Sequence, residues 1–379
     1  MNCKQLVILF SKNILLRNVN RTHFKKNSLL IYVTKPFVKK YGKVTHPNYY
    51  KARIISGCLK ECGYNVDVIY SEYTRKLDLR KYSFIIGMGE GYTNTYGKTD
   101  RHCKRVYLAT GTCFTTANQR ELERWISLYQ KNKGFAGAER FEKVKDYVKA
   151  VGSLYDSDAV IAGGDNEWVM KSYEWIHSKK YMVGSIALTN FRYGDMSRNI
   201  HKSRHRVLFL CGNGCIHKGL DIVVEAFWER QDYELYIVGN VEEGFHNAYR
   251  KEIEQGNIVL EKFQDANSEA FREICSRCGF IINMSCSESC CTSVLTGMAT
   301  GLIPIITEAE GINIGDSGYL LMRADRQEIG KTLDMINQAT EEELIDKMEK
   351  ASGIIVNQYS QRSFYARFKE ALEDILEVG

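Results

Sequence analysis

Short apolar runs alternate with helix-like stretches along most of the chain, and this alternation predicts its architecture. In the first half, the apolar runs predict strands at residues 28–33, 65–70, 83–87, 105–109 and 159–162. Between them, the spacing of apolar residues predicts helices at residues 49–62, 118–130, 141–151 and 166–177. Strands that alternate with helices are typical of a parallel sheet covered by helices.

A second series of the same kind follows a polar stretch at residues 188–204. It predicts strands at 206–211, 233–239, 257–260 and 280–284, another that begins at Ile303, and helices at 222–228 and 294–300. Near the C-terminus, Phe364, Phe368, Leu372 and Ile375 recur at helical spacing with charged residues between them. We therefore expect an α/β domain at 1–190, a linker at 191–204, a second α/β domain at 205–358 and a final helix at 359–379.

Length and composition fit two globular domains. The 379 residues are 44% hydrophobic and include only 3 prolines, which disfavours a collagenous or linker-rich chain. The longest apolar run near the N-terminus, Leu6 to Phe10, is too short for a signal-peptide core, and no uncharged run approaches the ~18 residues of a membrane span. The 12 cysteines are dispersed rather than arranged as a disulfide framework. We expect a cytoplasmic protein with reduced thiols.

A metal site is the alternative use of some of these cysteines. Cys275 and Cys278 have the spacing of half a zinc site, and Cys286, Cys290 and Cys291 follow. The pattern favours buried, reduced cysteines, because Cys290 and Cys291 are adjacent and point apart. We expect no metal.

Charge divides the chain into a basic and an acidic half. Residues 1–190 hold 32 basic and 16 acidic residues, whereas residues 191–379 hold 20 and 30. An anionic partner is therefore expected for the first half: a membrane surface or a lipid-linked phosphate. Basic and apolar residues interleave between Lys4 and Lys26, as in a segment that lies on anionic lipid at the inner face of the membrane. A solvated extension, or a helix packed on the first domain, is the alternative. Nucleic acid ranks lower, because no aromatic stacking motif accompanies the charge.

Candidate chemistry is concentrated in two loops of the second half. In one, Glu288 follows an apolar strand, and a small-residue stretch, Ser289–Thr292, leads into a helix. In the other, Gly212 and Gly214 follow the strand at 206–211, and Lys218 stands near the next helix start. Loops at the carboxyl ends of parallel strands line the ligand crevice, and a helix N-terminus favours an anion. Together the loops suit a ligand that carries both hydroxyl and phosphate groups.

These two loops resemble those of GT-B glycosyltransferases, specifically the retaining family 4 group. The matching residues are Gly212, Lys218 and Gly219 in the first motif, and Glu288, Met298, Ala299, Gly301 and Pro304 in the second. The resemblance covers residues 204–325 well and the N-terminal half in outline. It implies two Rossmann-like domains that face a central crevice, with the last helix crossing back to the first domain.

The resemblance also implies a function and a set of site residues. The chain would move a sugar from a nucleotide-sugar, with UDP or GDP as the carrier, to a glycan or lipid-linked acceptor of polysaccharide biosynthesis, with retained configuration and without a metal or cofactor. Lys218 and Glu288 would be the catalytic pair. The donor would contact Gly212, Asn213, Gly214, His217, Gly239, Phe263, Ser289, Cys290, Cys291, Thr292 and Thr296. The acceptor would contact Gly42, His46, Asn48, Thr110 and Thr112.

Two positions depart from the family pattern. Asn213 stands where the family has an arginine that neutralises the leaving diphosphate, and Thr296 stands where it has a glutamate that holds the ribose. A protonated His217 would supply part of the missing charge. The departures leave a non-catalytic relative, acting as a partner subunit or glycan-binding protein, as the main alternative. A sugar-nucleotide epimerase and a phosphorylase are further alternatives.

Overall fold

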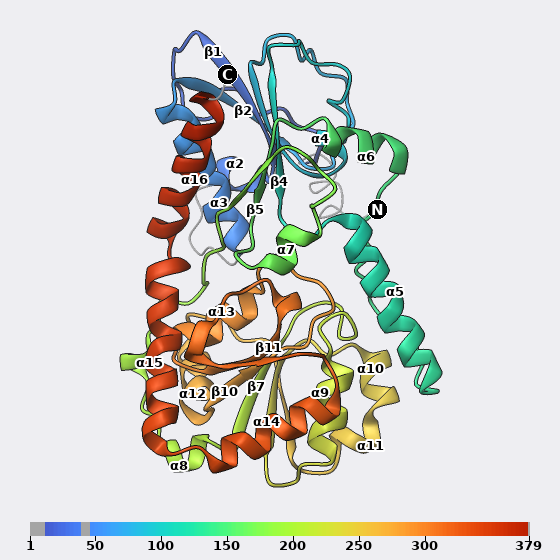
Figure 1. The fold of residues 1–379 in the computed structure, drawn as a ribbon, viewed down its shortest axis with the longest axis vertical. Helices are drawn as coiled ribbons and strands as arrows, with labels where there is room; N and C mark the ends of the chain where they lie inside the picture. The colour runs from blue at the N-terminus through green and yellow to red at the C-terminus, as the bar shows by residue number, and fades with distance from the viewer. Residues whose placement is uncertain (1–11, 39–45, 378–379) are drawn as a thin grey trace.

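Two parallel six-stranded sheets form the framework of the chain in a computed structural model that describes residues 12–38 and 46–377 (Figure 1). The first sheet has the strand order β2-β1-β3-β4-β5-β6 and the second the order β12-β11-β10-β7-β8-β9. Each sheet is covered by helices, as continuous apolar strands require. The predicted pair of doubly wound α/β domains is confirmed.

The first sheet comprises β1 (Lys26–Tyr32), β2 (Tyr64–Tyr70), β3 (Phe84–Gly87), β4 (Lys104–Ala109), β5 (Ala159–Ala162) and β6 (Lys179–Met182). Its helices are α2 (Lys35–Val38), α3 (Pro47–Glu61), α4 (Gly89–Thr93), α5 (Phe114–Gln130), α6 (Tyr147–Tyr155) and α7 (Glu167–Lys171). The sequence did not predict β6, because its residues are partly exposed at the sheet edge and lack a continuous apolar run.

The second sheet comprises β7 (Arg206–Cys211), β8 (Glu234–Gly239), β9 (Ile258–Glu261), β10 (Phe280–Ile282), β11 (Ile303–Thr307) and β12 (Tyr319–Leu321). Short helix α8 (Ile200–Ser203) lies in the expected linker. The remaining helices are α9 (Leu220–Trp228), α10 (Glu243–Ala248), α11 (Arg250–Ile253), α12 (Glu269–Arg277), α13 (Thr292–Ala299), α14 (Arg326–Gln338), α15 (Glu341–Gln358) and α16 (Gln361–Glu377).

Helix α16 returns to the first domain, as expected. Its apolar residues Phe364, Phe368 and Leu372 are buried in one core cluster with Ile55 and Leu59 of α3. In Figure 1, α15 and α16 run as a continuous column along one side of both domains. The second domain thus contributes its last helix to the core of the first.

Helix α5 and the loop after it make the reverse crossing, which the sequence did not predict. We call residues 114–140 the cross-domain arm. Leu128 is fully buried in the core of the second domain, where Trp125 and Phe135 pack against the same cluster. Arg124 forms an ion pair with Asp221 on α9. The arm therefore descends from the first domain along the side of the second (Figure 1).

Two local expectations, both about helix bounds, were wrong. The helix predicted at 141–151 begins only at Tyr147, where Asp146 caps it by accepting a hydrogen bond from the Lys149 amide at 2.9 Å. The helix predicted at 166–177 ends at Lys171. In the described part of the basic N-terminal segment, residues 12–26, Leu16 forms an antiparallel bridge with β2 and packs against the core of the first domain.

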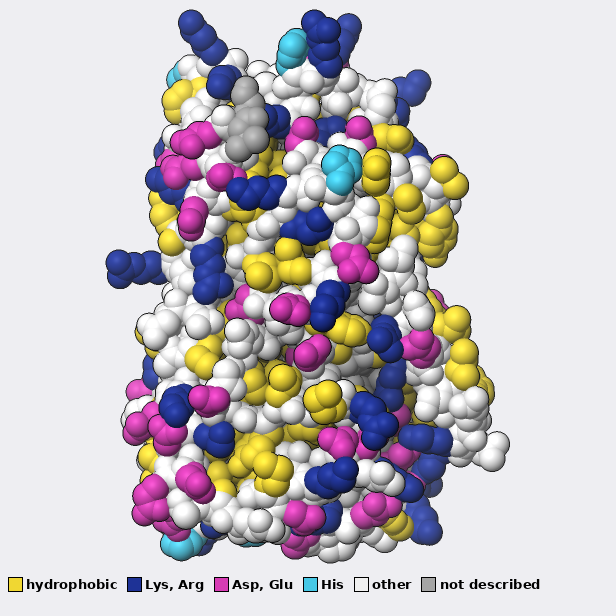
Figure 2. Space-filling model, in the orientation of Figure 1, with side chains coloured by type: hydrophobic (Ala, Val, Ile, Leu, Met, Phe, Trp, Pro, Cys, Tyr) yellow, Lys and Arg dark blue, Asp and Glu magenta, His cyan; other side chains and the backbone are white. Residues whose placement is uncertain are grey.

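On the face shown in Figure 2, Lys and Arg side chains project from the upper end, which the first domain forms, whereas acidic and basic side chains are mixed over the second domain. None of the helices within residues 12–38 and 46–377 has the length and apolar character of a membrane span.

Candidate functional site

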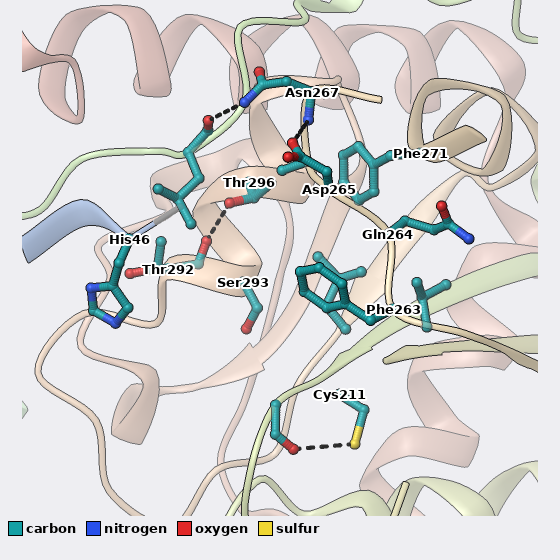
Figure 3. Close-up of a pocket in the computed structure, with 15 residues that line it drawn as sticks. His46, Cys211, Phe263, Gln264, Asp265, Asn267, Phe271, Thr292, Ser293 and Thr296 are labelled. Carbon is teal, nitrogen blue, oxygen red and sulfur yellow. Dashed lines mark hydrogen bonds between the residues drawn. The ribbon is translucent and has the colours of Figure 1, made fainter. Parts of the chain in front are cut away.

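The carboxyl ends of the two sheets face each other across a crevice that contains a cavity of about 330 Å³. Its size is within the usual range of small-ligand pockets, roughly 300–1,000 Å³. Figure 3 shows the side chains around it, which come mainly from the second domain. The cavity is lined by His46, Leu188, Leu210, Cys211, Gly212, Val238, Phe263, Gln264, Asp265, Ala266, Asn267, Phe271, Thr292, Ser293 and Thr296.

Four residues predicted to bind the donor line this cavity: Gly212, Phe263, Thr292 and Thr296. The Phe263 side chain is 67% exposed and so offers an open aromatic face. The Thr296 hydroxyl donates to the Thr292 carbonyl at 2.7 Å, in the preceding turn of α13. The Thr296 hydroxyl could therefore accept a hydrogen bond from a ribose hydroxyl. To donate one, it would have to give up its bond to Thr292.

The turn after β7 is closed tightly around its glycines. Gly219 has φ +72°, and a Cβ there would lie 2.2 Å from the Met284 carbonyl oxygen, so only glycine fits between α9 and the loop after β10. The amides of Gly214 and Cys215 both donate to a Glu242 carboxylate oxygen at 2.9 Å. The amide of Gly214, a residue expected to contact the donor, is thus already occupied by a protein carboxylate.

Lys218 and Glu288 meet, as the resemblance implied. Their side chains form a buried ion pair, with Lys218 only 8% exposed. Burial alone would raise the pKa of Glu288, but the positive charge of Lys218 and the hydrogen bond from His217 hold it well below its usual range. The pKa of Lys218 is raised in turn, because the thiol of Cys291 and the carboxylate of Glu288 outweigh its burial. The Lys218 Nζ also lies 3.9 Å from the Cys291 sulfur, next to Thr292 of the cavity.

His217 connects this ion pair to the cross-domain arm. Its Nδ1 is 2.7 Å from a carboxylate oxygen of Glu121 on α5, and its Nε2 is 3.4 Å from Glu288. Burial opposes protonation, yet hydrogen bonds with Cys286, Glu121 and Glu288 raise the pKa of His217 to about 11. His217 therefore carries a positive charge at neutral pH, and a residue of the first domain fixes its orientation.

Within residues 12–38 and 46–377, the side chains with metal-ligand spacing are Glu121, His217 and Cys286 rather than Cys275 and Cys278. Their 2.7 Å nitrogen–oxygen contact has the length of a charge-assisted hydrogen bond. Cys275 and Cys278 are instead buried in a core cluster beside α12 and β10.

Two buried polar atoms around the crevice, Ser289 Oγ and Glu310 Oε2, have no hydrogen-bond partner among the described residues. His217 Nε2 makes the 3.4 Å contact with Glu288. Buried polar atoms are nearly always hydrogen-bonded, so such a cluster indicates where a polar ligand completes the site.

Glu310 lies directly behind the ion pair and gives the site a titratable acid. It is fully buried, and its Oε1 accepts a hydrogen bond from the Ser285 amide at 2.6 Å. Burial raises the pKa of Glu310 to about 7, although Lys218 opposes this. The folded protein therefore holds this proton more tightly than the unfolded chain, whose glutamates titrate near 4.5.

We predict a pH-dependent difference between the natural protein and Glu310→Gln. As pH rises from the ordinary glutamate pKa to about 7, the free energy of unfolding should fall by up to about 3 kcal/mol in the natural protein through this residue alone. The variant should lack that contribution. Urea unfolding of both proteins at roughly pH 5 and roughly pH 8 measures it. Parallel pH profiles would exclude a proton on Glu310.

The other expected donor residues surround this centre. Asn213 is exposed, and its carbonyl accepts from Arg140 Nη1 at 3.4 Å. Gly239 ends β8 against Cys211. Ser289 faces the first domain at Gly163, and the Cys290 thiol lies between Lys51 and Asp165.

The expected acceptor residues do not form one group. His46 caps α3 by accepting from the Asn48 amide at 3.2 Å, and it also lines the cavity. The Thr110 hydroxyl contacts the Met88 sulfur at 3.0 Å. Thr112 is buried and hydrogen-bonded to Ser287 of the second domain, so it joins the domains. Gly42 lies outside the described residues.

Four residues that contact this region were missed in the sequence: Arg140, Glu121, Glu242 and Lys51. Arg140 and Glu121 belong to the arm, and only the docking of the two domains brings them here. Lys51 gave a usable signal, because it shares a helical stripe with the apolar residue Ile55 and is buried with it. A cation on an apolar stripe is a candidate functional residue.

Two facing Rossmann-like domains, joined by a returning C-terminal helix, define the GT-B fold. Residues 204–338 match the profile of the family described as Glycosyl transferases group 1, which confirms the resemblance seen in the motifs. No curated protein sequence matches the chain.

Solved structures share the fold at low sequence identity. HepE from Anabaena, in complex with UDP and glucose, is 11% identical with a TM-score of 0.58, over 93% of this chain and 100% of that one. Sucrose-phosphate synthase from Thermosynechococcus elongatus is 10% identical with a TM-score of 0.63, over 93% and 100%. WaaG, a glycosyltransferase involved in lipopolysaccharide biosynthesis, is 13% identical with a TM-score of 0.56, over 92% and 99%.

Proposed function

We propose that this chain is a glycosyltransferase that moves a sugar from a nucleotide-sugar to a hydroxyl group of a glycan or lipid-linked acceptor, with retention of configuration. The observation that carries the proposal is the buried Lys218–Glu288 pair beside a cavity at the carboxyl ends of the second sheet. The family match over residues 204–338 and the solved GT-B structures with bound UDP support the same reading.

In the proposed complex, the base and ribose occupy the cavity near Phe263 and Thr296, and the diphosphate lies toward Lys218. Negative charge develops on the diphosphate as its bond to the sugar breaks. Lys218 and the protonated His217 are already in place to stabilise that charge, which costs little reorganisation at the moment of reaction. Glu288 accepts hydrogen bonds from the sugar hydroxyls, and the acceptor arrives from the first domain. No metal or cofactor is assigned to the reaction.

Arg140 of the cross-domain arm supplies a further cation to this proposed site. Its side chain lies on Gly214, where a Cβ would be 2.7 Å from Arg140 Cδ, and its guanidinium reaches the Asn213 carbonyl. No carboxylate pairs with it among the described residues. Its charge acts on both Glu288 and Lys218. Arg140 therefore offers, from the other domain, the positive charge that Asn213 does not.

We predict that Arg140→Ala weakens binding of a nucleoside diphosphate by about ten-fold, the value of one charge-assisted hydrogen bond. Binding of the monophosphate should change little, because its phosphate lies nearer the ribose. Calorimetry with UDP and UMP measures both. Lys145→Ala, an exposed lysine in the following loop, is the control. Placing the charge back in the glycine turn, by Asn213→Arg in the Arg140→Ala background, should restore the affinity. Equal losses for UDP and UMP would contradict this role.

The first test of the proposed function is calorimetry with UDP, GDP, ADP and CMP. Tight binding of one nucleotide is expected and identifies the donor base. Absence of binding to all four would reject the donor site and favour the non-catalytic relative, which the departures at Asn213 and Thr296 suggest. Release of free nucleotide from the matching nucleotide-sugar would then distinguish a transferase from a binding protein.

A further inference from the structure

A buried lysine without a counter-ion lies where the two domains meet. Lys51, on α3 of the first domain, is 9% exposed. Among the described residues, no acid or hydrogen-bond acceptor pairs with its ammonium group; its recorded contact is with the ring of Phe364, 5.7 Å away. An unpaired buried charge is costly, so an anion that paired with Lys51 would remove an unfavourable feature of the fold.

A second buried polar group without a hydrogen-bond partner among the described residues, the hydroxyl of Ser289, lies near Lys51. Gly163 follows β5, and a Cβ at this glycine would lie 3.8 Å from Lys51 Nζ and 3.0 Å from Ser289 Oγ. The Ser289 hydroxyl is buried and has no hydrogen-bond partner among the described residues. The ammonium group of Lys51, from the first domain, and the unpaired hydroxyl of Ser289, from the second, therefore lie on either side of Gly163.

The neighbouring charges do not satisfy Lys51. Burial lowers the pKa of Lys51 to about 8, and the opposing group is the thiol of Cys290 rather than a carboxylate. The nearby acid Asp165 is already hydrogen-bonded to the Tyr359 hydroxyl and to the Asn313 amide. His46, the other titratable group close by, is neutral or positive and cannot neutralise Lys51; burial and the charge of Lys51 lower its pKa.

We propose that Lys51, Gly163 and Ser289 form a subsite that binds a phosphate or carboxylate group of a substrate at the junction of the two domains. Lys51 provides the charge, Ser289 donates a hydrogen bond, and Gly163 places no side chain between them. The subsite consists of residues other than the Lys218–Glu288 pair, and phosphate binding to it can be measured whether or not the chain transfers a sugar.

The test is an NMR titration of the full chain with inorganic phosphate, after the lysines are labelled by reductive ¹³C-methylation. Loss of one signal in Lys51→Arg assigns Lys51. Phosphate should move this signal in a saturable way, whereas chloride at the same ionic strength should not. An unmoved signal, or equal movement with chloride, would overturn the proposal.

Two variants make the test specific. Gly163→Ala places a methyl group between Lys51 and Ser289. It should abolish the phosphate-induced shift of the Lys51 signal although Lys51 itself is unchanged. Ser289→Ala should weaken phosphate binding by about five-fold, the effect of one neutral hydrogen bond. An undiminished shift in Gly163→Ala would show that the anion binds elsewhere and would refute the subsite.

Repeating the titration with UDP identifies the source of the anion. If UDP itself moves the Lys51 signal and blocks the phosphate shift, the subsite takes the diphosphate of the donor. If phosphate still moves the signal in the presence of bound UDP, the subsite takes an anionic acceptor. Phosphate binding at Lys51 without binding of any nucleotide would support the subsite and contradict the proposed function. Failure of the subsite and failure of the proposed function can therefore be told apart.

Discussion

Lys218→Ala is expected to weaken nucleotide binding by about ten- to a hundred-fold, because a buried charge-assisted contact with phosphate contributes roughly 1.5–3 kcal/mol. Turnover should fall further, since the same charge stabilises the leaving diphosphate as it forms. Calorimetry with the preferred nucleotide, and nucleotide release from the donor, measure the two effects. Full turnover in the variant would remove Lys218 from the site.

This experiment needs controls for folding, because Lys218 is the partner of a buried carboxylate. Removing one member of a buried pair costs about 3–5 kcal/mol of stability. Lys218→Gln keeps a hydrogen-bond donor toward Glu288 without the charge, so it separates the loss of charge from the loss of fold. Lys202→Ala, an exposed lysine on α8, should leave binding and turnover unchanged.

Glu288→Gln is expected to have the opposite balance of effects. Turnover should fall by about a hundred-fold or more, the usual effect of removing one preorganised contact to the reacting group. Affinity for UDP alone should stay the same or rise, because UDP lacks the transferred sugar that Glu288 would contact and because the charge of Lys218 is no longer neutralised by its partner. Glu261→Gln, a substitution on β9 away from the ion pair, is the control.

The two outcomes for Glu288 are easily separated. A fall in UDP affinity that parallels the fall in turnover would mean that Glu288 organises the phosphate site rather than the sugar. Unchanged turnover would exclude it from the reaction and would strengthen the case for a non-catalytic relative.

The sequence predicted those parts of the fold that local patterns determine. Strands β5 and β7 match the predicted ranges because both are continuous apolar runs bounded by polar residues. The helix expected at 141–151 was wrong at its start, because Asp146 caps the helix at Tyr147 and Val144, before the cap, packs on the first-domain core from an irregular segment. Periodicity cannot distinguish an apolar residue that serves its own helix from one that serves a distant core.

The site shows the same division. Lys218 and Glu288 were predictable because each follows a strand of one parallel sheet, and the carboxyl ends of such strands meet. Glu121 and Arg140 were not, because they approach the site from another domain and their contribution depends on how the domains dock. Glu242 was missed for a different reason. Its carboxylate accepts hydrogen bonds from the backbone amides of Gly214 and Cys215, and such contacts produce no recognisable sequence motif.

The two crossings between the domains have a consequence for how the protein unfolds. The core of the first domain includes Phe364, Phe368 and Leu372 from the end of the chain, and the core of the second includes Leu128 from the arm. Neither core is complete without side chains from the other half. Melting either domain would expose apolar surface in its neighbour, so the chain should lose its structure in a single cooperative transition rather than domain by domain.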